Sequence, residues 1–282
     1  MTELTNEHGI VCVRLDLFQE DGEAWAIVAS WKKGVDGVPD KSAWNEAIES
    51  SIAECEKNGA IFIDSRVITA CEGVDEALAG ARAAIHRDSL AARGFKQGEG
   101  RVEYRMDLEE ALAALEAGKT TSRLAWSCVD GDDEMELARA AGILLQASED
   151  DPASHPDDDS LGFLKVLLEE EGTNAVPERI QIGMCEGVPA AILALRLYPG
   201  DGWSTIHYLG VLPAFRGRGF GAEAMLRAFR CLKAMGGKVY QDGTGSNNAA
   251  ARALFARLGR PPFRAMEDWR LEKKICPQQK SG

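Results

Sequence analysis

The sequence has no long apolar run. The longest, such as Ala190–Leu195, fall far short of the roughly 20 residues that a membrane-spanning helix requires. The opening residues, MTELTNEHG, do not combine a basic start with an apolar stretch, as a secretory signal does. We therefore expect a cytoplasmic protein without a membrane partner.

Paired cysteines and an excess of positive charge are missing as well. The seven cysteines stand singly, in an odd number and without a C-x-x-C spacing, so we expect neither disulfides nor a zinc site. The 32 Lys and Arg residues against 45 Asp and Glu residues give a net charge of −13. Such a surface disfavours nucleic acid and attracts cations. We expect no nucleic-acid partner and no bound metal.

Two series of alternating apolar segments are present, in a chain of 282 residues that is long enough for two domains. In the first series we expect strands at 10–18, 25–31, 60–68 and 101–108, and helices at 43–57 and 74–93. In the second we expect strands at 123–129, 179–185, 190–198, 203–211, 238–242 and 267–271, and helices at 107–117, 132–146, 161–171, 222–235 and 248–258. Ser160 is expected to cap the helix that follows it.

The two series repeat one pattern. Trp203, Gly237 and Asp242 each stand 178 residues after a residue of the same type, namely Trp25, Gly59 and Asp64. Further on the offset is 165, and it relates Gly259, Trp269 and Arg270 to Gly94, Tyr104 and Arg105. We therefore predict a duplicated unit, with an incomplete copy in residues 1–115 and a complete one in residues 116–282.

A cationic, glycine-rich bend separates the strand at 203–211 from the helix at 222–235. Backbone N–H groups that precede a helix point to one place and carry partial positive charge, so they form a cradle for an anion. Glycine lets phosphate oxygens approach, and Arg216 and Arg218 can add charge-assisted hydrogen bonds to a pyrophosphate. At offset 178 the first copy has Val38, Lys41 and Ala43 in place of the bend residues. We expect one working site, in the second copy.

Two other phosphate-binding motifs partly match the sequence. Gly217-x-Gly219-x-x-Ala222 followed by Asp242 fits a loose dinucleotide pattern, in which the acid would bind a ribose. The residues between the strand and the glycines argue against it, because a dinucleotide turn follows its strand at once. Gly118-Lys119-Thr120 resembles the end of a P-loop, but Ala113 stands where that motif requires glycine.

The motif Val211-x-Pro213-x-x-Arg216-Gly217-x-Gly219-x-Gly221 resembles the pyrophosphate motif of the GNAT N-acetyltransferase superfamily, and a second stretch from Asn248 to Gly259 is similar to its downstream signature. The resemblance implies an α/β fold of two GNAT-like units, each a mixed, mostly antiparallel sheet flanked by helices. The tandem arrangement resembles mycothiol synthase in architecture only.

The resemblance also implies acetyl-CoA as the co-substrate. Its pyrophosphate would lie on the backbone of Arg216, Gly217, Arg218, Gly219, Phe220 and Gly221, and its pantetheine arm along Leu209, Gly210 and Val211, with Asn248 bonding the arm or capping its helix. His207 is the candidate general base. Tyr208 is the other candidate catalytic residue, and in a regular strand only one of these two side chains can line the site.

The acceptor is expected to be the primary amine of a small molecule or peptide. Five aspartates of the loop from Ser148 to Ser160 can attract an ammonium group, although a solvated charge run is the simpler interpretation; a metal at His155 beside them is not favoured. Phe255 stands where many family members have the tyrosine that protonates the leaving thiolate. A non-catalytic acyl-CoA-binding protein is therefore the alternative, and a nicotinamide dinucleotide-binding protein a weaker one.

Overall fold

The structure is a computed structural model, and it describes residues 2–5, 11–20, 24–31, 37–57, 62–118, 122–150, 159–169, 179–198, 200 and 202–272. The chain divides into two compact units. The first contains residues 1–102, 245–247 and 262–282, and the second contains residues 103–244 and 248–261. The expected boundary at residue 115 stays a prediction, since the compact units exchange short segments along the chain.

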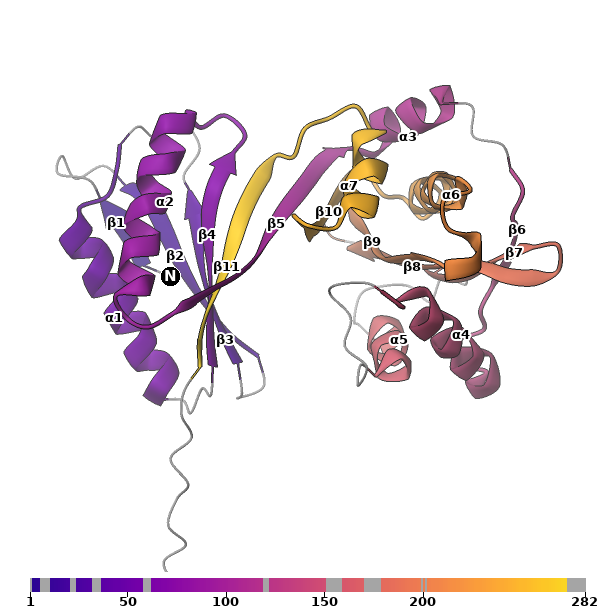
Figure 1. Cartoon of the computed structure of the whole chain (residues 1–282), viewed down its shortest axis with the longest axis horizontal. Helices are drawn as coiled ribbons and strands as arrows, with labels where there is room; N and C mark the ends of the chain where they lie inside the picture. Colours follow the sequence, from indigo (N-terminus) through magenta and orange to yellow (C-terminus); the bar gives the residue numbers. More distant parts are fainter. Residues whose placement is uncertain are drawn as a thin grey trace, which may run out of the picture. The chain divides into compact units, whose positions relative to one another are not determined.

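The first unit is a mixed sheet with two helices. Its elements are β1 (Thr2–Thr5), β2 (Val11–Glu20), β3 (Ala24–Trp31), α1 (Lys41–Lys57), β4 (Phe62–Cys71), α2 (Glu76–Ala91) and β11 (Arg264–Glu272). The strands lie in the order β1-β2-β3-β4-β11, and only β3 and β4 are parallel neighbours among these described strands. Figure 1 shows α1 and α2 side by side on one face of this sheet.

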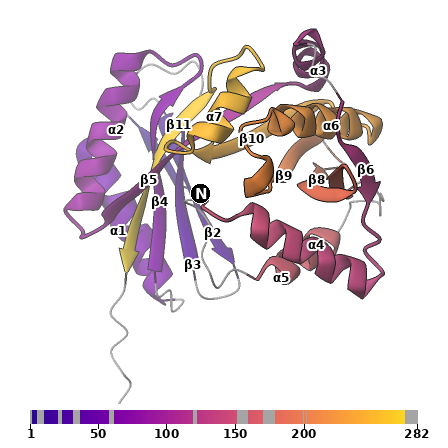
Figure 2. The same ribbon diagram turned by 45° about the vertical axis from the view of Figure 1, so that its right-hand side comes forward.

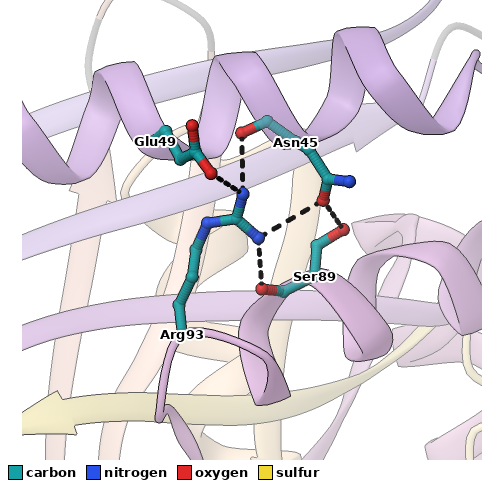
Figure 3. A network of polar contacts seen from close by, with 4 residues as sticks. All are labelled: Asn45, Glu49, Ser89 and Arg93. Atoms are coloured by element: carbon teal, nitrogen blue, oxygen red, sulfur yellow. Dashed lines mark hydrogen bonds and ion pairs between the residues drawn. The ribbon is translucent and has the colours of Figure 1, made fainter.

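A polar network joins α1 to the end of α2 (Figure 3). The guanidinium of Arg93 donates to the backbone carbonyls of Ser89 (2.8 Å) and Asn45 (3.2 Å) and pairs with the carboxylate of Glu49. The Ser89 hydroxyl donates to the side-chain oxygen of Asn45 at 2.7 Å. Below this network, Trp44, Ile48 and Leu90 lie in the hydrophobic core, so packing and polar contacts both fix the helix pair.

The last strand of the second series belongs to the first unit, and the last strand of the first series is divided between the two units. β11 pairs with β4 along its whole length, from Arg264 opposite Cys71 to Glu272 opposite Phe62, and Trp269 packs in the first core. β5 (Lys96–Asp107) begins in the first unit and ends in the second. This exchange could not be expected from the sequence, because offset matches identify equivalent strands but not the sheet that each one joins.

The second unit has helices on both faces of its sheet. Its elements are α3 (Leu108–Ala117), β6 (Ala125–Cys128), α4 (Glu134–Ala147), α5 (Ser160–Glu169), β7 (Ile180–Cys185), β8 (Val188–Tyr198), β9 (Trp203–Val211), a 3-10 turn (Pro213–Phe215), α6 (Phe220–Ala234), β10 (Val239–Gly245) and α7 (Ala249–Ala256). The strand order is β10-β9-β8-β7-β6. Figures 1 and 2 both show α6 on one face, and α4 with α5 on the other.

The predicted α/β class with mixed sheets flanked by helices is confirmed. β9 has the bounds expected from the sequence, whereas β1 was not expected. The expected cap of α5 was wrong by one residue: Asp159, not Ser160, accepts a hydrogen bond from the helix, through the N–H of Gly162 at 2.8 Å. No helix within the described ranges is long and apolar enough to cross a membrane.

Candidate functional site

The glycine bend presents a row of backbone N–H groups. Gly217 and Gly219 have φ angles of 72° and 85°, a region that favours glycine. No side chain caps the start of α6 at Gly219. Among the described residues, the N–H groups of residues 217–222 donate no hydrogen bond within the fold. They are therefore available to an anion at the N-terminus of α6.

A pocket of about 390 Å³ opens at this bend. Its walls come from the end of α4, the last residues of β9, the bend and α7. Every predicted cofactor residue except Arg218 lines it, together with Tyr208, which gives the set Tyr208, Leu209, Gly210, Val211, Arg216, Gly217, Gly219, Phe220, Gly221 and Asn248. His207 is not among the lining residues. The pocket therefore runs from the phosphate cradle along the end of β9.

β9 parts from β10 before it reaches the pocket. The parallel pairing of the two strands covers only Trp203 with Val239 and Ser204 with Tyr240. On its other side, β9 remains paired with β8 up to Val211. Among the described strands, none pairs with the β9 edge beyond Ser204 on the β10 side. An amide-rich ligand can add itself to such an edge by main-chain hydrogen bonds.

His207 and Tyr208 lie on the same face of β9, contrary to the expectation for a regular strand. The register with β8 shifts between Ala194 and Leu195, which pair with Tyr208 and Ile206, so His207 is an extra, bulged residue. The ring of Phe163, from α5, is 5.1 Å from that of His207 and 6.5 Å from that of Tyr208. The bulge therefore brings both candidate catalytic side chains to the side covered by α4 and α5.

Tyr208 is held at the pocket wall by the end of α4. Its hydroxyl lies 2.7 Å from the Ser148 hydroxyl, and Ser148 follows the last residue of α4. A side chain at Gly210 would meet Tyr208 Oη at 2.8 Å and Ala147 Cβ at 2.6 Å. Glycine at 210 is thus required for the tyrosine ring to lie across the strand. The sequence offered no signal for the Ser148 contact.

Arg216 binds the protein backbone. Its guanidinium donates to the carbonyls of Val211 (3.1 Å), Ala147 (3.1 Å) and Glu149 (2.5 Å), and lies 3.6 Å from the carboxylate of Asp150. These contacts join the end of α4 to the end of β9 across the pocket. Its side chain therefore shapes the cradle.

The part of the chain that contains the bend is similar to a known protein family. Residues 144–259 match the acetyltransferase (GNAT) family. The matched segment contains β9, the bend, α6 and α7, which are the elements that line the pocket. No curated protein matches the chain by sequence.

Solved structures of GNAT proteins share the fold. A GCN5-related N-acetyltransferase from Sphaerobacter thermophilus aligns with a TM-score of 0.60 and 12% identity over 94% of this chain and 78% of its own. One from Kribbella flavida aligns with a TM-score of 0.57 and 16% identity over 92% and 87%. A tandem GNAT protein from the clavulanic acid biosynthesis pathway gives 0.55 and 13% over 95% and 81%. At these identities the likeness concerns the fold.

Asn248 and Phe255 belong to the stretch after β10 that is similar to the GNAT downstream signature, and the structure shows what each contacts. The Asn248 side-chain oxygen accepts the N–H of Ala251 at 3.0 Å and so caps α7, while the residue also lines the pocket. Phe255, also on α7, is buried. The hydroxyl of the nearby Tyr240 donates to Asp242 at 2.8 Å. Arg218, on the bend, lies over the rings of Phe215 and Phe220 instead of lining the pocket.

The acidic loop after α4 is described only in part. Asp150 pairs with Arg216, and Asp159 caps α5. His155 and the aspartates at 151, 157 and 158 lie outside the described residues. Within the described ranges, no group of three or more His, Cys, Asp or Glu side chains could hold a metal ion.

Proposed function

We propose that the second unit transfers an acetyl group from acetyl-CoA to a primary amine. The observation that carries the proposal is the row of unbonded N–H groups at residues 217–222, which leads into a pocket along the open edge of β9. A diphosphate fits the row, and an amide-containing arm fits the edge. Coenzyme A contains both groups in this order.

The cradle needs no side-chain cation for this binding. The N-terminus of α6 provides N–H groups and the positive end of the helix dipole. Arg216 contributes through the backbone that it holds. In the proposed complex, the thioester lies near Leu209–Val211, where a backbone N–H on the open edge of β9 polarises its carbonyl as it becomes tetrahedral.

In the proposed reaction, the amine nitrogen attacks the thioester carbon, a C–N bond forms and the C–S bond breaks. His207 accepts the proton that the amine loses, and Tyr208 donates a proton to the departing thiolate. Two observations support these roles: the bulge puts both side chains on one face, and Tyr208 lines the pocket with its hydroxyl beside Ser148.

The acceptor is proposed to be a cationic small molecule or peptide that approaches from the side of α4 and α5. The net charge of −13 favours such a ligand. The first unit is proposed to be a degenerate copy of the second, in a tandem arrangement. The repeated element order supports this, because each series runs through two antiparallel strands, a helix, a parallel strand, a helix and a final strand.

An acyl-CoA-binding protein without turnover is the second candidate. It is favoured by Phe255, which cannot donate a proton and is packed in a buried contact. A nicotinamide dinucleotide-binding protein is a weaker candidate. The 3-10 turn that separates β9 from the glycines argues against it, because a dinucleotide-binding turn follows its strand at once.

The experiment is release of free thiol from acetyl-CoA in the presence of a panel of primary amines. We expect amine-dependent thiol release that is lost in Gly219→Trp, which fills the cradle. Tight binding of coenzyme A without release for any amine would select the binding protein. A thermal shift with NAD but none with coenzyme A would select the dinucleotide-binding protein.

A further inference from the structure

Asp242 lies where β10 leaves β9. It stands two residues beyond Tyr240, the last residue of β10 that pairs with β9. Its carboxylate accepts hydrogen bonds from the Tyr240 hydroxyl (2.8 Å) and the Gly243 N–H (2.7 Å), both on β10. Hydrogen bonding with the Thr205 side chain and the Ile206 backbone, both on β9, also lowers the pKa of this carboxyl.

The carboxylate replaces the missing strand pairing. Asp242 lies just beyond the last paired residue of β10, and hydrogen bonding with Ile206 of β9 contributes to its pKa. Two donors of β10 lie within hydrogen-bonding distance of the carboxylate, and its two oxygens have acceptor sites left for the groups of β9. Tyr240 is fully buried and its ring packs on that of Phe229 at 4.4 Å, so one end of the cluster is fixed in the core.

The first unit provides an internal comparison. Asp64 stands at the equivalent sequence position, 178 residues earlier. There the parallel pairing of β3 and β4 runs for five residues, from Ala24 opposite Phe62 to Val28 opposite Arg66, and it passes Asp64. The Asp64 carboxylate pairs instead with Arg270 of β11. The parallel strands thus separate before Asp242 and stay paired past Asp64.

We propose that Asp242 is a positioning residue, which holds β9 apart from β10 and fixes the β9 edge against which the pantetheine arm of coenzyme A binds. This inference rests on the proposed function of the pocket. It assigns no contact between Asp242 and the ligand. Asp242 acts through Thr205 and Ile206, which precede the pocket-lining part of β9.

The protonation state of Asp242 gives this role a pH dependence. Burial raises the pKa of the carboxyl to about 6, and the four hydrogen bonds oppose the rise. Tyr240 faces it from its own strand, and Thr205 and Ile206 face it from β9. Below pH 6 the added proton takes one acceptor from the cluster and introduces a donor. The interaction of Asp242 with Thr205 and Ile206 of β9 should therefore weaken as the pH falls through 6.

The test compares two ligands by calorimetric titration of the full chain. Coenzyme A carries the diphosphate and the pantetheine arm, whereas ADP-ribose carries a similar diphosphate without the arm. In Asp242→Asn, whose side-chain NH₂ cannot accept a hydrogen bond, we expect coenzyme A affinity to fall on the order of tenfold. ADP-ribose affinity should not change. Thr205→Val should give a smaller loss in the same direction.

Asp64→Asn is the matched control and should leave both affinities unchanged. The wild-type protein is titrated with dephospho-CoA and ADP-ribose between pH 5 and 8, because neither ligand has a phosphate monoester that titrates there. The affinity for dephospho-CoA, divided by the affinity for ADP-ribose, should fall as the pH drops through about 6. This measurement remains decisive if Asp242→Asn fails to fold.

Three results would overturn the inference: equal losses for both ligands in Asp242→Asn, no loss for coenzyme A, or a pH-independent affinity ratio in the wild-type protein. Failure of the wild-type protein to bind coenzyme A at all would instead overturn the proposed function, and with it the basis of the inference.

Discussion

The rings of Phe255 and Tyr104 are stacked, with centroids 4.2 Å apart and planes within 10° of parallel. Only 5% of Phe255 and 4% of Tyr104 is exposed. The position that the GNAT resemblance gives to a proton-donating tyrosine is therefore a core contact in this chain. We propose instead that Tyr208 of β9 is the proton donor.

Removal of the Tyr208 hydroxyl should slow the chemical step. We expect Tyr208→Phe to lower kcat by about 100-fold, at the low end of general acid catalysis, with little change in KM for acetyl-CoA. Phe255→Tyr is the matched comparison, because it adds a hydroxyl in the core. We expect it to leave kcat unchanged and to cost on the order of 1 kcal/mol of stability. A large rise in kcat for Phe255→Tyr would show that the acid role is vacant.

Removal of the His207 imidazole should affect the reaction where the acceptor amine is protonated. We expect His207→Ala to lower kcat/KM mainly at pH values below the pKa of the acceptor, because no base then removes its proton. The measurement is the pH–rate profile of both proteins. Phe163→Leu, which removes the ring stacked on His207, serves as the control and should keep the shape of the profile. An unchanged profile in His207→Ala would exclude the histidine.

The two ends of α6 allow a matched test of the cradle. Gly219 and Gly236 both have positive φ angles, 85° and 95°, so alanine at either should cost about 1 kcal/mol of stability. Only Gly219 belongs to the cradle, where the unfavourable φ angle would displace the N–H groups and the added Cβ would lie 3.4 Å from Arg123 Nη2. We expect Gly219→Ala to weaken coenzyme A binding by tenfold or more, and Gly236→Ala to leave binding unchanged. Equal affinities for the two variants would argue that the diphosphate lies elsewhere.

The first unit should lose stability in acid through His86. This histidine is buried between Ser65, at 3.2 Å, and the ring of Trp44, at 4.6 Å, and burial lowers its pKa to about 3. It stays neutral in the fold, whereas in the unfolded chain it gains a proton below about pH 6.5. The free energy of unfolding should therefore fall as the pH drops from 6.5 towards 3, at up to about 1.4 kcal/mol per pH unit.

Urea unfolding of wild-type and His86→Gln proteins between pH 4 and 7 measures this effect. The difference between the two proteins should shrink with falling pH, because the glutamine does not titrate. Parallel pH dependences would contradict the assignment.

Local patterns in the sequence were enough to find the cradle. β9 and the bend are contiguous, and the angles at Gly217 and Gly219 are a property of a few residues. The part of the pocket lining that β9 and the bend contribute lies in the same stretch, whereas the end of α4 adds residues that the sequence did not suggest.

Features that depend on distant strands could not be predicted. The bulge at His207 is a register shift against β8, and it changed the face on which Tyr208 lies. The Ser148 contact depends on where α4 ends. Asp242 suggested a ribose-binding acid in the sequence, and only the neighbouring β9 shows that its carboxylate is taken up within the sheet.

The central claim is that the N–H groups of residues 217–222 bind the diphosphate of coenzyme A. The most direct measurement is a titration of the ¹⁵N-labelled protein with coenzyme A, followed through the backbone amide resonances. We predict that the largest shifts and the strongest protection from hydrogen exchange occur at residues 217–222. Saturable binding that leaves these amides unshifted and exchanging as before would contradict the claim.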